Sequence, residues 1–187
     1  DIQCDGGEGP WILNDKDKAF SIDKHSHIIL NPLYVDVNSK TLLTKLQNQL
    51  SKEALLMTEE VADIVNRLHA FYYSLEFGYP LSIQHKLEIG TAELIKLGSF
   101  NFEFNRKGDI MDLISYIEVV DTLLSPMLYI VVNLDLVLND DELNVFYKNM
   151  LSRQLRLVCL TTGSLKKEKL DKSLINGYIL DNDFCVI

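Results

Sequence analysis

The feature that most constrains the fold is a short apolar run, residues 127–132 (MLYIVV), with helix-like patterns on either side. Its β-branched and aromatic residues follow one another without a polar interruption, which is typical of a strand buried on both faces of a parallel sheet. Before the run, apolar residues from Ile110 to Leu124 recur at helical spacing. After it, Asn139 and Glu142 have the spacing of a capping box that starts a second helix.

The order of these patterns along the chain predicts the fold class. Residues 100–104 (FNFEF) alternate like a strand, and residues 155–162 (LRLVCLTT) predict a buried one. From Phe100 to Thr161 the order is therefore strand, helix, strand, helix, strand. This predicts an α/β fold with a mainly parallel sheet, right-handed crossovers and helices on both faces. Further short strands are predicted at HIILNP (27–32), GYILD (177–181) and FCVI (184–187).

Residues from about 39 to 98 predict a helical arm. Asn38 or Ser39 can cap a first helix, Thr58 can cap a longer one that ends near Gly78, and Thr91 starts a short helix closed by Gly98. A chain of 187 residues is long enough for one good core. We therefore expect a single α/β domain over residues 1–187 with a helical projection, and a further segment before Asp1.

Charge and composition restrict the class of protein. The net charge of −9 argues against a generally basic nucleic-acid binder. The stretch from Lys148 to Lys172 nevertheless holds seven basic residues against two acidic ones, which predicts either a solvated helix face or a basic surface on an acidic body. No apolar run approaches the roughly 18 residues of a membrane span. Three scattered cysteines fit a reducing compartment, so we expect a cytoplasmic protein with no membrane contact: Cys4, Cys159 and Cys185.

Asp135 follows the apolar run at the place where a nucleotide hydrolase would hold magnesium. Such an enzyme also needs a G-x-x-x-x-G-K-[ST] loop, which the 187 residues do not contain; DGGEGP (5–10) has no lysine after its glycines. Two interpretations stay open. Asp135 could serve a degenerate nucleotide-binding enzyme that uses magnesium, or Asn133 and Asp135 could lie in the turn after a structural strand.

Four histidines are candidate metal ligands. His25 and His27 are two residues apart, so on a strand they would share a face and could hold a metal. His69 lies beside the apolar stripe of a predicted helix, and His85 lies in a mixed stretch. Neither has a cysteine or second histidine at ligand spacing, so we expect structural histidines.

Three lysines lie in one polar segment, NDKDKAFSIDKH (14–25): Lys16, Lys18 and Lys24. Lysines spaced by two project to one side of an extended chain and can touch successive phosphates. A polar segment of this kind is more often a solvated loop. Both interpretations stay open at this point.

Several segments together resemble the small CRISPR-associated spacer-acquisition proteins of type II-A systems. The resemblance covers nearly the whole chain in order and rests on divergent patterns, without an invariant catalytic motif. Its segments are ILNDKDKAF (12–20), TAELIKLGSFNFEFNRKGDIMDLISYIEVV (91–120), LLSPMLYIVVNLDLVLNDDELNVFYKNMLSRQLRLVCLTT (123–162) and KLDKSLINGYILDNDFCVI (169–187).

The resemblance implies a homotetrameric ring whose subunits have a helical leg and an α/β head. The head is similar to P-loop ATPase domains but lacks their phosphate loop, so no nucleotide is expected. Such rings thread onto the ends of linear double-stranded DNA, independent of sequence and without catalysis, and support spacer acquisition beside the CRISPR effector nuclease and integrase. Lys16 and Lys18 match lysines of the family, and with Lys24 they are the expected DNA-binding residues.

Calcium is also implied by the resemblance. The family carries several acidic residues just after its long helix. Glu76 matches one of them, but GYPLSIQHK (78–86) follows where the others would stand. Glu88 and Glu118 are further candidates for a rebuilt site. The first hypothesis is thus a non-enzymatic DNA clamp; a magnesium enzyme that uses Asp135 and a scaffold that binds only protein are the alternatives.

Overall fold

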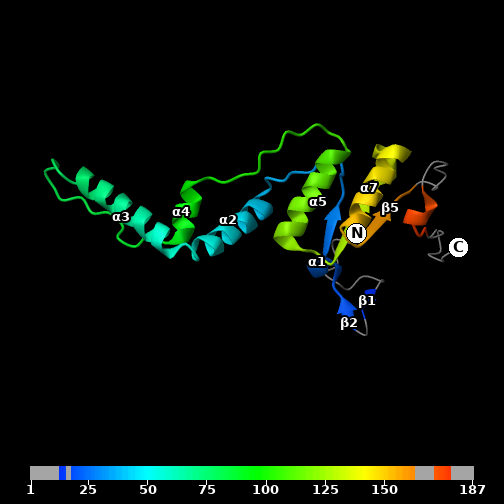
Figure 1. The fold of residues 1–187 in the computed structure, drawn as a ribbon, viewed down its shortest axis with the longest axis horizontal. Coiled ribbons are helices and arrows are strands. Elements are labelled where there is room, and N and C mark those ends of the chain that lie inside the picture. Colours follow the sequence, from blue (N-terminus) through cyan, green and yellow to red (C-terminus); the bar gives the residue numbers. More distant parts are fainter. Residues whose placement is uncertain (1–12, 16–17, 163–170, 178–187) are drawn as a thin grey trace. The chain divides into compact units, whose positions relative to one another are not determined.

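The computed structural model describes residues 13–15, 18–162 and 171–177, which fall into two compact units (Figure 1). The sheet unit combines the chain up to Asp36 with the chain from Asn105 onward. The helical unit is the continuous segment Val37–Phe104. It contains the three helices that the sequence predicts between about residues 39 and 98.

The sheet unit is built on a three-stranded parallel sheet. Its strands are β3 (Ser26–Ile29), β4 (Leu128–Val132) and β5 (Leu157–Leu160), in the order β3-β4-β5. His27 pairs with Tyr129, and Tyr129 with Leu157. The predicted α/β class with a parallel sheet is therefore confirmed.

Two helices that cross between these strands pack on the same face of the sheet: α5 (Ile110–Leu124) and α7 (Asp140–Ser152). Both crossovers step in the same direction across the sheet, and right-handed crossovers then place both helices on one side. Residues of α5 and α7 accordingly contact each other (Figure 1). Each helix also contacts a strand residue of that face. Tyr129 of β4 donates a hydrogen bond to Asp121 of α5, and a hydrogen bond links Cys159 of β5 to Tyr147 of α7.

Burial in β4 alternates, which differs from the expectation of a strand covered on both faces. Tyr129 and Val131 are 1% and 0% exposed, while their neighbours on the opposite face are half-buried. On that opposite face of β5, Val158 and Leu160 are 42% and 44% exposed. The core of the sheet unit therefore lies on the helix-covered side, and its buried apolar residues are Ile29, Val35, Ile110, Leu113, Ile114, Ile117, Val120, Tyr129, Val131, Leu134, Leu138, Leu143, Phe146 and Met150.

Helices α5 and α7 begin where their capping residues predict. Asp109 caps α5 by accepting hydrogen bonds from the backbone N–H groups of Met111 and Asp112. Asn139 and Glu142 form the predicted capping box of α7: Asn139 Oδ1 accepts from Glu142 N at 3.0 Å, and Glu142 Oε2 accepts from Asn139 N at 2.9 Å. Two short helices were not predicted: α1 (Ile22–His25), which directly precedes β3, and α6 (Leu134–Val137), which directly follows β4.

The helical unit contains α2 (Lys40–Ala54), α3 (Thr58–Leu75) and α4 (Thr91–Leu97). Ser39 is the N-cap residue of α2, although its side chain makes no capping hydrogen bond. Helices α2 and α4 pack against each other, whereas α3 contains no buried residue. No helix in the described ranges has both the length and the apolar content to cross a membrane.

The predicted strand at residues 100–104 is wrong. These residues form no strand, because a side chain takes the place of a neighbouring strand as their hydrogen-bond partner. Phe102 N donates to Asn38 Oδ1 at 2.8 Å, and Asn38 Nδ2 donates to Phe102 O at 3.0 Å. The amide of Asn38 thus satisfies both backbone groups of Phe102 as a paired strand residue would.

Smaller elements flank the sheet in the chain. Strands β1 (Leu13–Asp15) and β2 (Lys18–Phe20) form an antiparallel hairpin, followed by α1 (Ile22–His25). Near the C-terminal side, a single 3-10 turn, η1, covers Lys172–Leu174. The strands predicted at GYILD (177–181) and FCVI (184–187) lie, except for Gly177, outside the described residues.

Candidate functional site

The predicted DNA-binding lysines belong to the hairpin and the short helix that precede the sheet. Lys18 is the first residue of β2, and its backbone pairs with that of Asp15. Lys24 lies in the last turn of α1 with an exposed side chain. Lys16 lies outside the described residues. Contact of these lysines with DNA stays a prediction.

An exposed arginine near the start of α5 is a candidate that sequence reasoning missed. The guanidinium of Arg106 lies over the ring of Tyr34, 4.5 Å from its centroid, and donates to Leu33 O at 2.7 Å. Tyr34 is itself 71% exposed. Stacking on an aromatic ring restricts the arginine without removing its charge, so Arg106 presents a positioned cation at the surface.

The turn after Arg106 is fixed by a buried carboxylate. Asp112 is 4% exposed, and its Oδ2 accepts hydrogen bonds from Lys107 N at 2.7 Å and Gly108 N at 2.6 Å. Gly108 has φ +74°, a left-handed conformation that a side chain would disfavour. Two adjacent basic residues, Arg106 and Lys107, are therefore held exposed at one place. Lysine and arginine spacing alone did not distinguish this pair from a solvated loop.

The end of β4 holds Asp135, the residue on which the magnesium hypothesis depends. Asp135 lies in the first turn of α6, and its Oδ2 accepts a hydrogen bond from Thr161 Oγ1 at 2.5 Å. Asn133 adopts a left-handed conformation with φ +56°, and its N–H donates to Leu160 O at 2.7 Å. These bonds tie the ends of β4 and β5 together, which is a structural role for Asp135.

The thiol beside this strand end is not reactive. Burial raises the pKa of Cys159 to about 11, and the hydrogen bond from Tyr147 offsets only part of that rise. Burial also raises the pKa of Tyr147. At neutral pH the raised pKa of Cys159 favours the protonated thiol over the thiolate, which is the nucleophilic form. Cys159 is a free, half-buried cysteine, and Cys4 and Cys185 lie outside the described residues.

His25 and His27 do not form a metal-binding pair in the structure. His25 belongs to α1, and its Nδ1 lies 3.0 Å from Ser21 O. His27 belongs to β3, and its Nε2 lies 2.9 Å from Tyr116 Oη of α5. The helix ends between the two residues, so they do not share a strand face. Burial lowers the pKa of His27, which keeps its ring neutral at pH 7.

Glu76 lies in a compact cluster at the end of α3. Its Oε1 lies 2.6 Å from Nδ1 of His85, and Nε2 of His85 lies 3.2 Å from Nδ1 of His69. The rings of Tyr72 and Tyr73 flank His85 at centroid distances of 5.3 and 4.6 Å. The side chains of His85 and Glu76 are 13% and 26% exposed. No sequence pattern indicated His85 as a partner of Glu76, because His85 belongs to the irregular segment after α3, which folds back against that helix.

Calcium does not fit Glu76 in this arrangement. Calcium takes six to eight oxygen ligands, and the group that meets the Glu76 carboxylate is an imidazole. Within the described ranges no three His, Cys, Asp or Glu side chains gather to ligate a metal. The alternative Glu118 is paired with Arg153, and Glu88 lines a separate hollow. No functional step is therefore derived through calcium.

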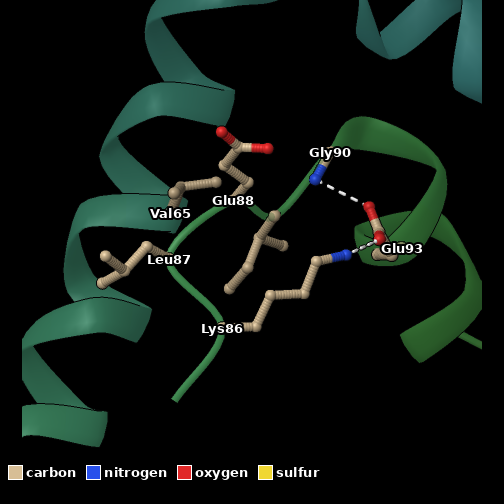
Figure 2. Close-up of a pocket in the computed structure, with 7 residues that line it drawn as sticks. Val65, Lys86, Leu87, Glu88, Gly90 and Glu93 are labelled. Atoms are coloured by element: carbon tan, nitrogen blue, oxygen red, sulfur yellow. Dashed lines mark hydrogen bonds and ion pairs between the residues drawn. The ribbon is translucent and has the colours of Figure 1, made fainter. Parts of the chain in front are cut away.

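That hollow lies between α3 and the segment that leads into α4. It has a volume of about 510 Å³ and is lined by Val65, Lys86, Leu87, Glu88, Ile89, Gly90 and Glu93 (Figure 2). Glu93 forms an ion pair with Lys86 and accepts from Gly90 N at 2.7 Å. Lys86 and Glu93 are committed to each other, and Glu88 is the other charged residue of the lining, so the hollow shows no convergent set of groups for a ligand.

The structure defines a class of protein: a parallel α/β sheet unit, interrupted between its first two strands by a helical unit, with the strand-end carboxylate used structurally. A comparison with protein families then places the chain. It belongs to the type II-A CRISPR family described as CRISPR-associated protein (Cas_Csn2), whose family model matches residues 3–184. The resemblance inferred from the sequence is confirmed. No curated protein matches the chain.

Proposed function

We propose that this protein binds the ends of linear double-stranded DNA as a homotetrameric ring, without sequence preference and without catalysis, to support CRISPR spacer acquisition. It would act in the cytoplasm beside the effector nuclease and the integrase and would need no nucleotide. The single observation that carries the proposal is the family match over residues 3–184. The ring and the DNA are properties that the resemblance implies for this chain.

The charge pattern supports enclosure of DNA over binding on an open surface. The chain carries −9, and seven of its 18 basic residues lie between Lys148 and Lys172. At physiological ionic strength the Debye length is about 8 Å, so an open surface with this average charge attracts duplex poorly. In a ring, basic side chains from four subunits converge on one duplex, and topology opposes escape even where each contact is weak.

The test compares linear duplex with closed circular duplex of the same length at the same salt concentration. We expect the linear duplex to bind and the closed circle to bind poorly, because a ring needs an open end. Equal affinity for both forms would contradict enclosure and favour an ordinary basic surface, for which Arg106 and Lys107 are candidates. Binding to neither form would favour a scaffold that binds only protein.

A second candidate function is a nucleotide-binding enzyme that uses Asp135 and magnesium. The position of Asp135 just after a central parallel strand favours it, since ligands of α/β proteins lie at the carboxyl ends of such strands. The bond from Thr161 Oγ1 to Asp135 opposes it, because that carboxylate oxygen is already used. ATP turnover that Asp135→Ala abolishes would establish the enzyme; its absence would leave the DNA-binding proposal in place.

A further inference from the structure

The contacts among His69, His85 and Glu76 restrict where the ring protons of the two histidines can lie. An ionised carboxylate only accepts hydrogen bonds, so at 2.6 Å from Glu76 Oε1 the Nδ1 of His85 carries the proton. When its Nε2 carries no proton, His85 presents the lone pair of this nitrogen toward Nδ1 of His69, 3.2 Å away. His69 can meet this lone pair with its own N–H, or it can present a second lone pair from the other tautomer.

In the second tautomer two nitrogen lone pairs face each other, which is favourable only with a cation between them. We propose that His69 Nδ1 and His85 Nε2 bind a borderline divalent transition metal such as Zn²⁺, with Glu76 orienting His85. Zn–N bonds of about 2.0–2.1 Å at a tetrahedral angle place two nitrogens about 3.3 Å apart. The observed 3.2 Å is close to this value, so replacing the shared proton by a metal needs little change in the distance between the two nitrogens.

The surroundings fit this chemistry. A carboxylate that accepts the other ring N–H is the usual partner of a metal-binding histidine, because it fixes the tautomer and raises ligand basicity. Glu76 has this position relative to His85. Imidazole nitrogen suits zinc, copper and nickel, whereas calcium prefers oxygen. The protein supplies two nitrogen ligands and water supplies the rest. Glu76 is also the residue that the resemblance matches to calcium binding, but here its carboxylate meets an imidazole, which suits zinc and not calcium.

The two ligands come from different parts of the helical unit. His69 is on α3, two helical turns before Glu76 and on the same face of the helix. His85 lies in the irregular segment that connects α3 to α4. A metal bound by both would close a loop of the chain between residues 69 and 85. We therefore expect metal to stabilise the helical unit, independent of DNA.

The test is calorimetric titration of the full chain, without a histidine tag, with Zn²⁺. We expect about one equivalent to bind per chain. His69→Ala and His85→Ala should each weaken this binding at least tenfold, and Glu76→Gln about tenfold. His25→Ala is the matched control, because its ring contacts Ser21 O in the sheet unit, and it should leave the affinity unchanged. Unchanged affinity in both His69→Ala and His85→Ala would overturn the proposal.

A second measurement covers variants that fold poorly. In the unaltered chain, ¹⁵N-detected imidazole signals report which ring nitrogens meet the metal. On addition of Zn²⁺ we expect the signals of His69 Nδ1 and His85 Nε2 to shift and those of His25 and His27 to stay. Shifts at His25 or His27 alone, or displacement of Zn²⁺ by a tenfold excess of Ca²⁺, would contradict the site. Neither readout involves DNA, so failure here leaves the proposed function untouched.

Discussion

His27 is a neutral ring inside the interface between β3 and α5, with its Nε2 2.9 Å from Tyr116 Oη. Burial lowers its pKa below the ordinary 6.5, so the unfolded chain takes up the proton more readily than the folded chain. The stability that the neutral ring contributes is therefore complete above pH 6.5 and is lost as the pH falls from 6.5 through the folded pKa.

We expect the free energy of unfolding to fall between pH 7 and pH 5, and His27→Phe to flatten this fall. One proton contributes at most about 1.4 kcal/mol per pH unit, and a half-buried ring contributes a fraction of that. Urea unfolding at several pH values measures the slope. His25→Gln is the control and should keep the original pH dependence. If His27→Phe also keeps it, another group titrates.

A second prediction at the scale of residues concerns the lysines before the sheet. Reversing Lys16 and Lys18 to Glu should weaken binding to every linear duplex alike, because phosphate contacts carry no sequence information. The slope of log affinity against log salt should flatten by about one for each phosphate that the protein no longer neutralises. Lys24→Glu should act in the same direction. Lys52→Glu, at an exposed position of α2, is the matched control; a slope unchanged by all of these reversals would remove the lysines from the DNA site.

Sequence could indicate single residues only where their partners are local. Asn38 could be proposed as a cap because that role involves the next three residues, but its actual partner, Phe102, is 64 positions away. The pairing of His69 with His85 was missed for the same reason. His69 and Glu76 share a helix face and could have been grouped, yet nothing in the sequence indicates where an irregular segment returns.

Among the elements, α7 offers the clearest test, because the side chain of Asn139 is the acceptor for a backbone N–H group of its first turn. Asn139→Ala removes the acceptor for Glu142 N and leaves the capping box half-formed. We expect a loss of about 1 kcal/mol in the free energy of unfolding, measured with urea. Asn101→Ala is the control: its exposed side chain makes one long bond to Ser99 O, and the change should stay within about 0.5 kcal/mol. A loss below that limit for Asn139→Ala would show that the cap does not stabilise the sheet unit.

The elements that sequence predicted well are those whose own residues satisfy their backbone. Helices α5 and α7 carry both a periodic apolar stripe and a cap, and each was placed correctly. A strand needs a neighbouring strand to satisfy its backbone groups. The alternation of apolar and polar residues at 100–104 therefore could not show whether this segment forms a strand. Which face of β4 the helices cover depends on the strand order, because this order determines on which side of the sheet both crossover helices lie. No single segment of the sequence contains the strand order.

At the scale of the whole molecule, the proposed ring predicts both a mass and a kinetic behaviour. Four chains of 21.4 kDa give about 86 kDa in solution by light scattering. On linear duplex loaded with protein, capping both ends with bulky groups should lengthen the residence time, because a ring leaves by sliding off an end. A monomeric mass would count against the ring, and residence times that do not respond to capping would contradict encirclement.

The pairing of β3 with β4 joins residues that are far apart in the chain, since His27 lies opposite Tyr129, 102 positions later. During synthesis β3 leaves the ribosome long before its partner exists, and the continuous segment Val37–Phe104 emerges in between. We therefore expect the helical unit to fold first, while β3 stays unpaired until β4 has been synthesised. Translation that stops before residue 132 would leave that strand without its neighbour and in need of a chaperone.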